Sequence, residues 1–124
     1  MSGALRAGAL VSLADAERPN QYPASRKLAW LRELDGLLYE ELLRPHELEA
    51  EPPAERYGED TPLLVGFPYG EQLYRAWLFT QIELSNGEIL RYNQALSLFQ
   101  WLWQLYADSL NRRARPRGAS GWRA

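Results

Sequence analysis

The chain has 124 residues, 46% of them hydrophobic, which is enough for one domain with its own core. Its 14 basic and 16 acidic residues give a net charge of −2, which argues against a general nucleic-acid-binding protein. It contains no cysteine, so disulfides and thiolate chemistry are excluded. No apolar run is long enough for a signal peptide or a membrane span, so we expect no membrane partner.

Helical periodicity predicts a first helix over residues 8–17, which Pro19 ends. A second helix is expected over residues 24–43, with Ser25 or a neighbour as its N-cap. The only histidine, His46, follows this helix, and we interpret it as a surface or helix-capping residue because a lone histidine makes a poor metal site. The second helix carries leucines at helical spacing on its buried face: Leu31, Leu34, Leu38 and Leu42.

Asp35 falls at the edge of that apolar face, where a buried carboxylate needs a partner. Arg75 or Arg91 could supply the partner. We expect a structural ion pair rather than a catalytic acid, because the spacing places no second titratable group beside Asp35. Other carboxylates that could be imagined as pairs, such as Glu83 with Glu88, are expected on solvated helix faces.

Residues 47–62 form a proline-rich segment without apolar periodicity, which predicts a long loop. It is either solvated or turned toward a channel or partner, and its acidic residues are Glu47, Glu49, Glu51, Glu55, Glu59 and Asp60. Residues 61–68 are an isolated strand or an extended lead-in to a third helix over residues 69–85. Asn86-Gly87 then marks a helix stop or the turn of a short β-hairpin near residues 82–92. We favour a helical hairpin, because both flanks continue helical patterns.

The longest helical pattern runs from Gly87 to about Arg113 or Ala114. One of its faces carries a core stripe: Tyr92, Ala95, Leu96, Phe99, Leu102, Trp103, Tyr106 and Leu110. A second set of apolar residues falls outside this stripe: Leu90, Leu98, Trp101 and Leu105. Either the helix lies at the centre of a bundle or the second set meets another chain. We interpret the second set as a subunit interface.

The sequence therefore predicts an all-α protein, with a small bundle of about four helices in residues 1–116 and a flexible basic tail in residues 117–124. A candidate docking segment, for which the alternative is a solvated tail, consists of Arg112, Arg113, Arg115, Arg117 and Trp122. The chain has no glycine-rich phosphate loop, no paired metal-binding helix motif and no nucleophile elbow. We expect no enzymatic activity, cofactor or metal.

Four segments, in this order, resemble small phage and prophage proteins of the head–tail connector, or adaptor, family. They are ERPNQYP at 17–23, WLRELDGLLYEEL at 30–42, LLVGFPYGEQLY at 63–74 and QIELSNGEILRYNQALSLFQ at 81–100. The resemblance covers roughly residues 15–116. Its most distinctive pieces are Arg18-Pro19-Asn20, Trp30-Leu31 with Glu33-Leu34-Asp35-Gly36, Asn86-Gly87-Glu88 and Arg91-Tyr92-Asn93. The chain departs from the pattern at Gly66, at Gly70 and in the tryptophan-rich segment 101–103.

The resemblance implies a helical protein of the virion neck, assembled in the bacterial cytoplasm as a homo-oligomeric ring beneath the portal. Such a ring extends the DNA channel and docks the tail, so the implied partners are further copies, the portal protein and a tail-side neck or tail-terminator protein. DNA would be contacted non-specifically at most. From the residues alone, the alternative is a small cytoplasmic helical adaptor or regulator that binds one protein partner through the same aromatic face. A weaker alternative is a nucleic-acid binder that uses the arginine-rich end.

Overall fold

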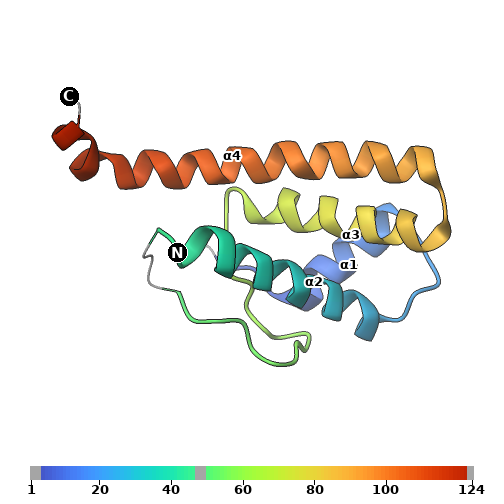
Figure 1. Ribbon diagram of the computed structural model, residues 1–124. Helices are drawn as coiled ribbons and strands as arrows, with labels where there is room; N and C mark the ends of the chain where they lie inside the picture. Colours follow the sequence, from blue (N-terminus) through green and yellow to red (C-terminus); the bar gives the residue numbers. More distant parts are fainter. Residues whose placement is uncertain (1–3, 47–49, 123–124) are drawn as a thin grey trace.

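The computed structural model describes residues 4–46 and 50–122, with side chains up to Arg113. Its helices are α1 (Ala7–Glu17), α2 (Ala24–Leu38), α3 (Gly70–Asn86) and α4 (Ile89–Trp122), and a π-helical turn, η1 (Tyr39–Leu43), extends α2. The described residues contain no strand, only an isolated bridge between Arg6 and Pro62, so the predicted all-α class is confirmed. The helices α3 and α4 form a long antiparallel hairpin, with α1 and α2 on the side of α3 away from α4 (Figure 1).

Gly87 ends α3 in the left-handed conformation, with a φ of 76°. Its amide donates to the Leu84 carbonyl at 3.1 Å, and the Glu88 amide donates to the Glu83 carbonyl at 3.0 Å. This glycine C-cap satisfies the last carbonyls of α3 and lets α4 begin two residues later. The favoured helical hairpin is therefore confirmed, and the β-hairpin alternative near residues 82–92 is wrong.

The predicted start of α2 at residue 24 is confirmed, but no side chain caps it, and the predicted end of the long C-terminal helix is wrong. The N-cap of α2 is Pro23, whose carbonyl accepts the amides of Arg26 and Lys27, while Ser25 lies inside the helix. The end of α4 is at Trp122 and not near Arg113. A proline removes only its own N–H bond and crowds one carbonyl, so a long helix can continue past Pro116 at some energetic cost. The flexibility of residues 117–124 stays a prediction.

The acidic loop lies against the beginning of α1. The amides of Ala7 and Gly8 donate to the carbonyls of Thr61 and Glu59, both at 2.8 Å, and the Leu63 amide donates to the Leu5 carbonyl at 2.8 Å. No side chain caps α1, so these carbonyls satisfy amides that the helix itself leaves free. Backbone hydrogen bonds thus hold the end of the loop, from Glu59 to Leu63, on the bundle.

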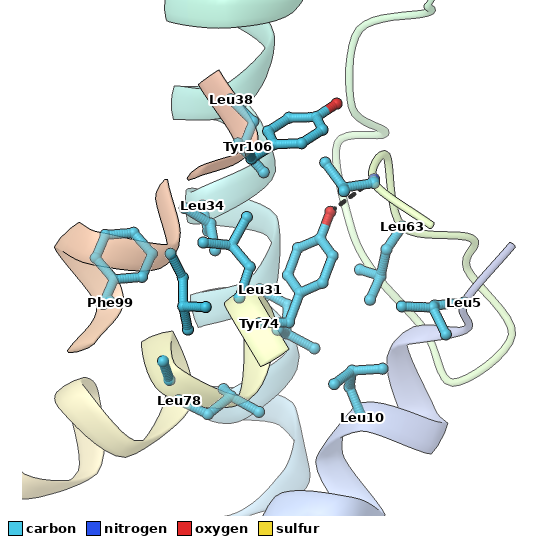
Figure 2. Packing of buried hydrophobic residues seen from close by; sticks show 14 of the residues in the cluster. Leu5, Leu10, Leu31, Leu34, Leu38, Leu63, Tyr74, Leu78, Phe99 and Tyr106 are labelled. Atoms are coloured by element: carbon cyan, nitrogen blue, oxygen red, sulfur yellow. Dashed lines mark hydrogen bonds between the residues drawn. The ribbon is translucent and has the colours of Figure 1, made fainter. Parts of the chain in front are cut away.

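One hydrophobic core joins all four helices, and the predicted stripes of α2 and α4 face it. Figure 2 shows Tyr74 of α3 at its centre, with its ring among leucines of α1 and α2 and its hydroxyl accepting the Val65 amide at 3.0 Å. The most deeply buried members include Leu10, Leu31, Leu34, Leu38, Leu73, Tyr74, Leu78 and Leu110. No helix of the described residues combines the length and apolarity that crossing a bilayer requires.

Two glycines inside helices provide a matched pair of stability predictions. A Cβ at Gly70 would lie 2.2 Å from the Val65 carbonyl oxygen, so Gly70→Ala forces the segment around Val65 away from α3. A Cβ at Gly36, within α2, would meet nothing within 4 Å. We expect Gly70→Ala to lower the free energy of unfolding by about 2–3 kcal/mol through overpacking, and Gly36→Ala to raise it by about 0.5–1 kcal/mol through helix propensity. Urea denaturation measures both, and equal effects would contradict the structure.

Candidate functional site

The second apolar set of α4 lies on the outside of the bundle. Leu90 is 79% exposed, Leu98 49%, Trp101 60% and Leu105 37%, whereas the core residues Phe99 and Leu102 on the same helix are 8% and 7% exposed. The helix is therefore an outer layer with one apolar face uncovered, and not the centre of the bundle (Figure 1). The predicted position of Leu90, Leu98, Trp101 and Leu105 outside the core stripe is confirmed. Their role as a subunit interface stays a prediction.

A shallow apolar cavity lies on another flank of α4. It has a volume of about 420 Å³ and is lined by Leu37, Glu41, Phe99, Gln100, Trp103 and Gln104. Its floor is aromatic: Phe99 packs on Trp103 with ring centroids 6.0 Å apart and on Trp77 at 5.1 Å. The Trp77 indole N–H donates to the Trp30 carbonyl of α2 at 2.8 Å, which fixes this floor to the neighbouring helix.

Two of the predicted docking arginines border a larger cleft. The cleft has a volume of about 570 Å³ and lies between the two arginines, Arg112 and Arg113, and the segment 64–69 that precedes α3. Phe67 and Tyr106 also line it. Burial raises the pKa of the Tyr106 hydroxyl, and the nearby Arg113 guanidinium opposes that shift. The side chains of Arg115, Arg117 and Trp122 lie outside those that the structure describes.

The described part of the acidic loop is exposed at its charged positions: Glu51, Glu55, Glu59 and Asp60. The ion pairs of the described residues include none of these four carboxylates. Glu47 and Glu49 lie outside the described residues. The loop therefore presents carboxylates that form no ion pair among the described residues, and α1 holds its backbone from Glu59 onward.

Asp35 is fully buried, as its position on α2 predicted, but its partners are not arginines. The Tyr57 hydroxyl donates to its Oδ2 at 2.5 Å, the Tyr74 hydroxyl donates to its Oδ1 at 2.5 Å, and the Leu64 amide donates to Oδ2 at 3.2 Å. Burial raises the pKa of the Asp35 carboxyl, and the three hydrogen bonds oppose that shift. Because every donor is neutral, this is a structural hydrogen-bond centre that ties α2 to α3 and to the loop.

The predicted ion pair of Asp35 with Arg75 or Arg91 is therefore wrong. Arg75 lies 3.5 Å from Glu17, and Arg91 is exposed. Tyrosine hydroxyls satisfy a buried carboxylate without burying a second charge, which removes the need for a cation. No local sequence signal points to them, because Tyr57 lies in a loop 22 residues from Asp35 and Tyr74 lies on another helix, 39 residues from Asp35.

Sequence reasoning missed two further buried charges, Lys27 and Glu83, and each has a partner in the segment 17–23. Lys27 is 2% exposed and donates to Asp15 at 2.7 Å and to the Asn20 side chain at 3.0 Å. Glu83, expected on a solvated face, is also 2% exposed and accepts from Arg18 at 2.9 Å. Arg18 and Asn20 of the turn 18–23 therefore hold α1, α2 and α3 together.

His46 is a capping residue, as predicted. Its Nδ1 lies 2.7 Å from the Leu42 carbonyl oxygen and its Nε2 lies 2.8 Å from Oδ1 of Asn111, so it joins the end of η1 to α4. Within residues 4–46 and 50–122, no group of three or more histidine, aspartate or glutamate side chains could hold a metal ion. The site that stands out is thus a set of surfaces around α4.

Comparisons of this chain with protein-family models, with curated proteins and with solved structures found no match.

Proposed function

We propose that the protein is a head–tail connector of a bacteriophage or prophage. In this role it is a structural protein of the virion neck that forms a ring between portal and tail, extends the DNA channel and docks the tail. The observation that carries the proposal is the apolar face of α4, whose residues Leu90, Leu98, Trp101 and Leu105 remain 37–79% exposed among the described residues. The order of sequence segments described above supports the same family.

An uncovered face of this kind is typical of a protein that works in an assembly. Apolar surface in water is unfavourable by about 25 cal/mol for each Å² that a partner could cover. Tryptophan is the residue most enriched among those that dominate binding energy, and Trp101 stands near the centre of the face with 60% of its surface exposed. Contacts between unlike surfaces of identical subunits close into rings when the rotation between copies divides a full turn.

The charged segments fit the two other contacts of a neck protein. The exposed carboxylates of the loop, Glu51, Glu55, Glu59 and Asp60, would line a channel through which DNA passes, because carboxylates do not bind phosphate. The cleft beside Arg112 and Arg113 would receive an acidic group of the portal protein or of a tail-side neck protein. The ring would assemble in the cytoplasm of the bacterial host and remain in the virion.

The test is to mix the purified protein with purified portal rings encoded by the same phage or prophage, and to follow the mixture by electron microscopy and size-exclusion chromatography. We expect ring-on-ring complexes, with the protein bound at one end of the portal. The free protein can be a monomer, since assembly proteins often polymerise only on their template. Absence of a complex with the portal, together with a one-to-one complex with a cytoplasmic protein, would overturn the proposal in favour of an adaptor.

A further inference from the structure

Two apolar surfaces flank α4, one formed by exposed side chains and the other by a cavity. The first, which we name the ridge, consists of Leu98, Trp101 and Leu105 and projects from the helix. The second, which we name the groove, is the cavity between α2, η1 and α4. The residues that line the groove are Leu37, Glu41, Phe99, Gln100, Trp103 and Gln104.

The ridge and the groove lie on opposite flanks of the same helix. At about 100° per residue, Trp101 points roughly half a turn away from the mean direction of Phe99 and Trp103. Between the two flanks runs a strip of polar residues, which we name the crest and which includes Ser97, Gln104 and Asp108. The Gln104 side-chain amide donates to Asp108 at 2.9 Å. Two copies placed side by side can therefore bring the ridge of one to the groove of the other while both crests stay in water.

The two surfaces also lie at the same level along α4. The ridge spans residues 98–105, and the α4 residues of the groove span 99–104. With a rise of about 1.5 Å per residue, their centres differ by less than about 2 Å along the axis. A copy that docks ridge to groove with its α4 parallel is thus displaced sideways with almost no rise along the helix, which is what a flat ring requires.

The groove suits an indole in size and chemistry. Its volume of about 420 Å³ exceeds the volume of one tryptophan side chain, and its walls are Leu37, Phe99 and Trp103. Leu37 is itself 40% exposed, so the wall gains cover when the groove is filled. An indole N–H needs a hydrogen-bond acceptor when it is buried, and Glu41 offers a carboxylate at the rim that forms no ion pair in the described part of the chain.

We propose that the groove is the site that receives the ridge of a neighbouring copy, with Trp101 seated between Leu37 and Trp103. The occupant is a second copy of this chain, because the chain itself supplies a protruding indole at the matching level. This inference rests on the proposed ring and adds to it which two surfaces meet.

The test uses the absence of native cysteine, which makes every thiol an introduced one. Leu98→Cys places a thiol on the ridge, and Leu37→Cys places one in the groove. A short thiol–thiol crosslinker is applied to the proteins alone and on portal rings. We expect the double variant to give a ladder of covalent multimers, an equal mixture of the two single variants to give dimers, and each single variant alone to give none. Leu98→Cys combined with Gln72→Cys, an exposed position of α3 outside both surfaces, is the matched control.

Each other result overturns the inference in a distinct way. Dimers of Leu98→Cys alone would mean that two ridges pair with each other about a two-fold axis. Ring-on-ring complexes that form without a crosslink between positions 37 and 98 would refute the ridge-and-groove contact and leave the connector function intact. Failure to form any ring on the portal would remove the connector function and this contact together.

Discussion

Replacing Asp35 with alanine is expected to lower the free energy of unfolding by about 3–5 kcal/mol. The substitution removes a fully buried carboxylate that accepts from Tyr57, Tyr74 and the Leu64 amide. It leaves three donors without an acceptor and opens a cavity between α2, α3 and the loop. Urea denaturation followed by circular dichroism measures the loss, and a change below about 1 kcal/mol would contradict the network.

Two milder variants, Asp35→Asn and Tyr57→Phe, test the same hydrogen bonds if the alanine variant does not fold. The amide oxygen of asparagine can accept from Tyr57 and Leu64, but its NH₂ group cannot accept from the Tyr74 hydroxyl. We expect an intermediate loss of about 1–3 kcal/mol for Asp35→Asn. Tyr57→Phe removes one donor at a half-buried position and should cost about 1 kcal/mol.

The pH dependence of stability offers an independent measurement on the same residue. Burial raises the pKa of Asp35 in the folded state above its ordinary value near 3.8, so at a pH between the unfolded and folded pKa values the folded protein keeps a proton that the unfolded chain has released. The stabilisation from this proton is complete below about pH 4 and is lost as the pH rises through the folded-state pKa. The difference in unfolding free energy between the parent and Asp35→Asn should therefore shrink as the pH is raised from 4. A difference that grows over that range would show a lowered pKa and refute the assignment.

The helices of this fold could be predicted from sequence because their signals are local. Periodic leucines predicted α2, Pro19 predicted the end of α1, and Asn86-Gly87 predicted the turn between α3 and α4. The side-chain cap expected from Ser25 or a neighbour is not formed, because the N-cap residue of α2 is Pro23, which has no polar side chain. The end of α4 was misplaced because a proline penalises a helix without forbidding it.

The partners of buried charges could not be predicted, because they are contacts between distant segments. A carboxylate at position 35 plainly needs a donor, yet sequence favoured arginine, the commonest partner of a buried acid. The fold supplies tyrosines from a loop and from α3. Lys27 was missed for the same reason, since Asp15 and Asn20 reach it only after the turn 18–23 folds back on α2. The apolar face of α4, by contrast, follows from helical spacing alone, and it was placed correctly.

Trp101→Asp should strongly weaken assembly while leaving the monomer folded. The indole is 60% exposed, so its loss removes little of the core, and we expect the free energy of unfolding to change by less than about 1 kcal/mol. In a subunit contact, however, the same change places a carboxylate in a desolvated apolar site. An anchoring tryptophan contributes about 2 kcal/mol or more, so binding to portal rings should weaken by at least about thirtyfold.

Ser97→Asp is the matched control, because it adds the same charge to the polar crest of α4, at an exposed position of the same helix. We expect it to assemble like the parent, which would separate the loss of an apolar anchor from the effect of added negative charge. Sedimentation with portal rings and circular dichroism of both variants give the two readouts. If Trp101→Asp assembles like the parent, the apolar face of α4 is not the subunit contact. The connector function would then depend on the resemblance between sequence segments alone.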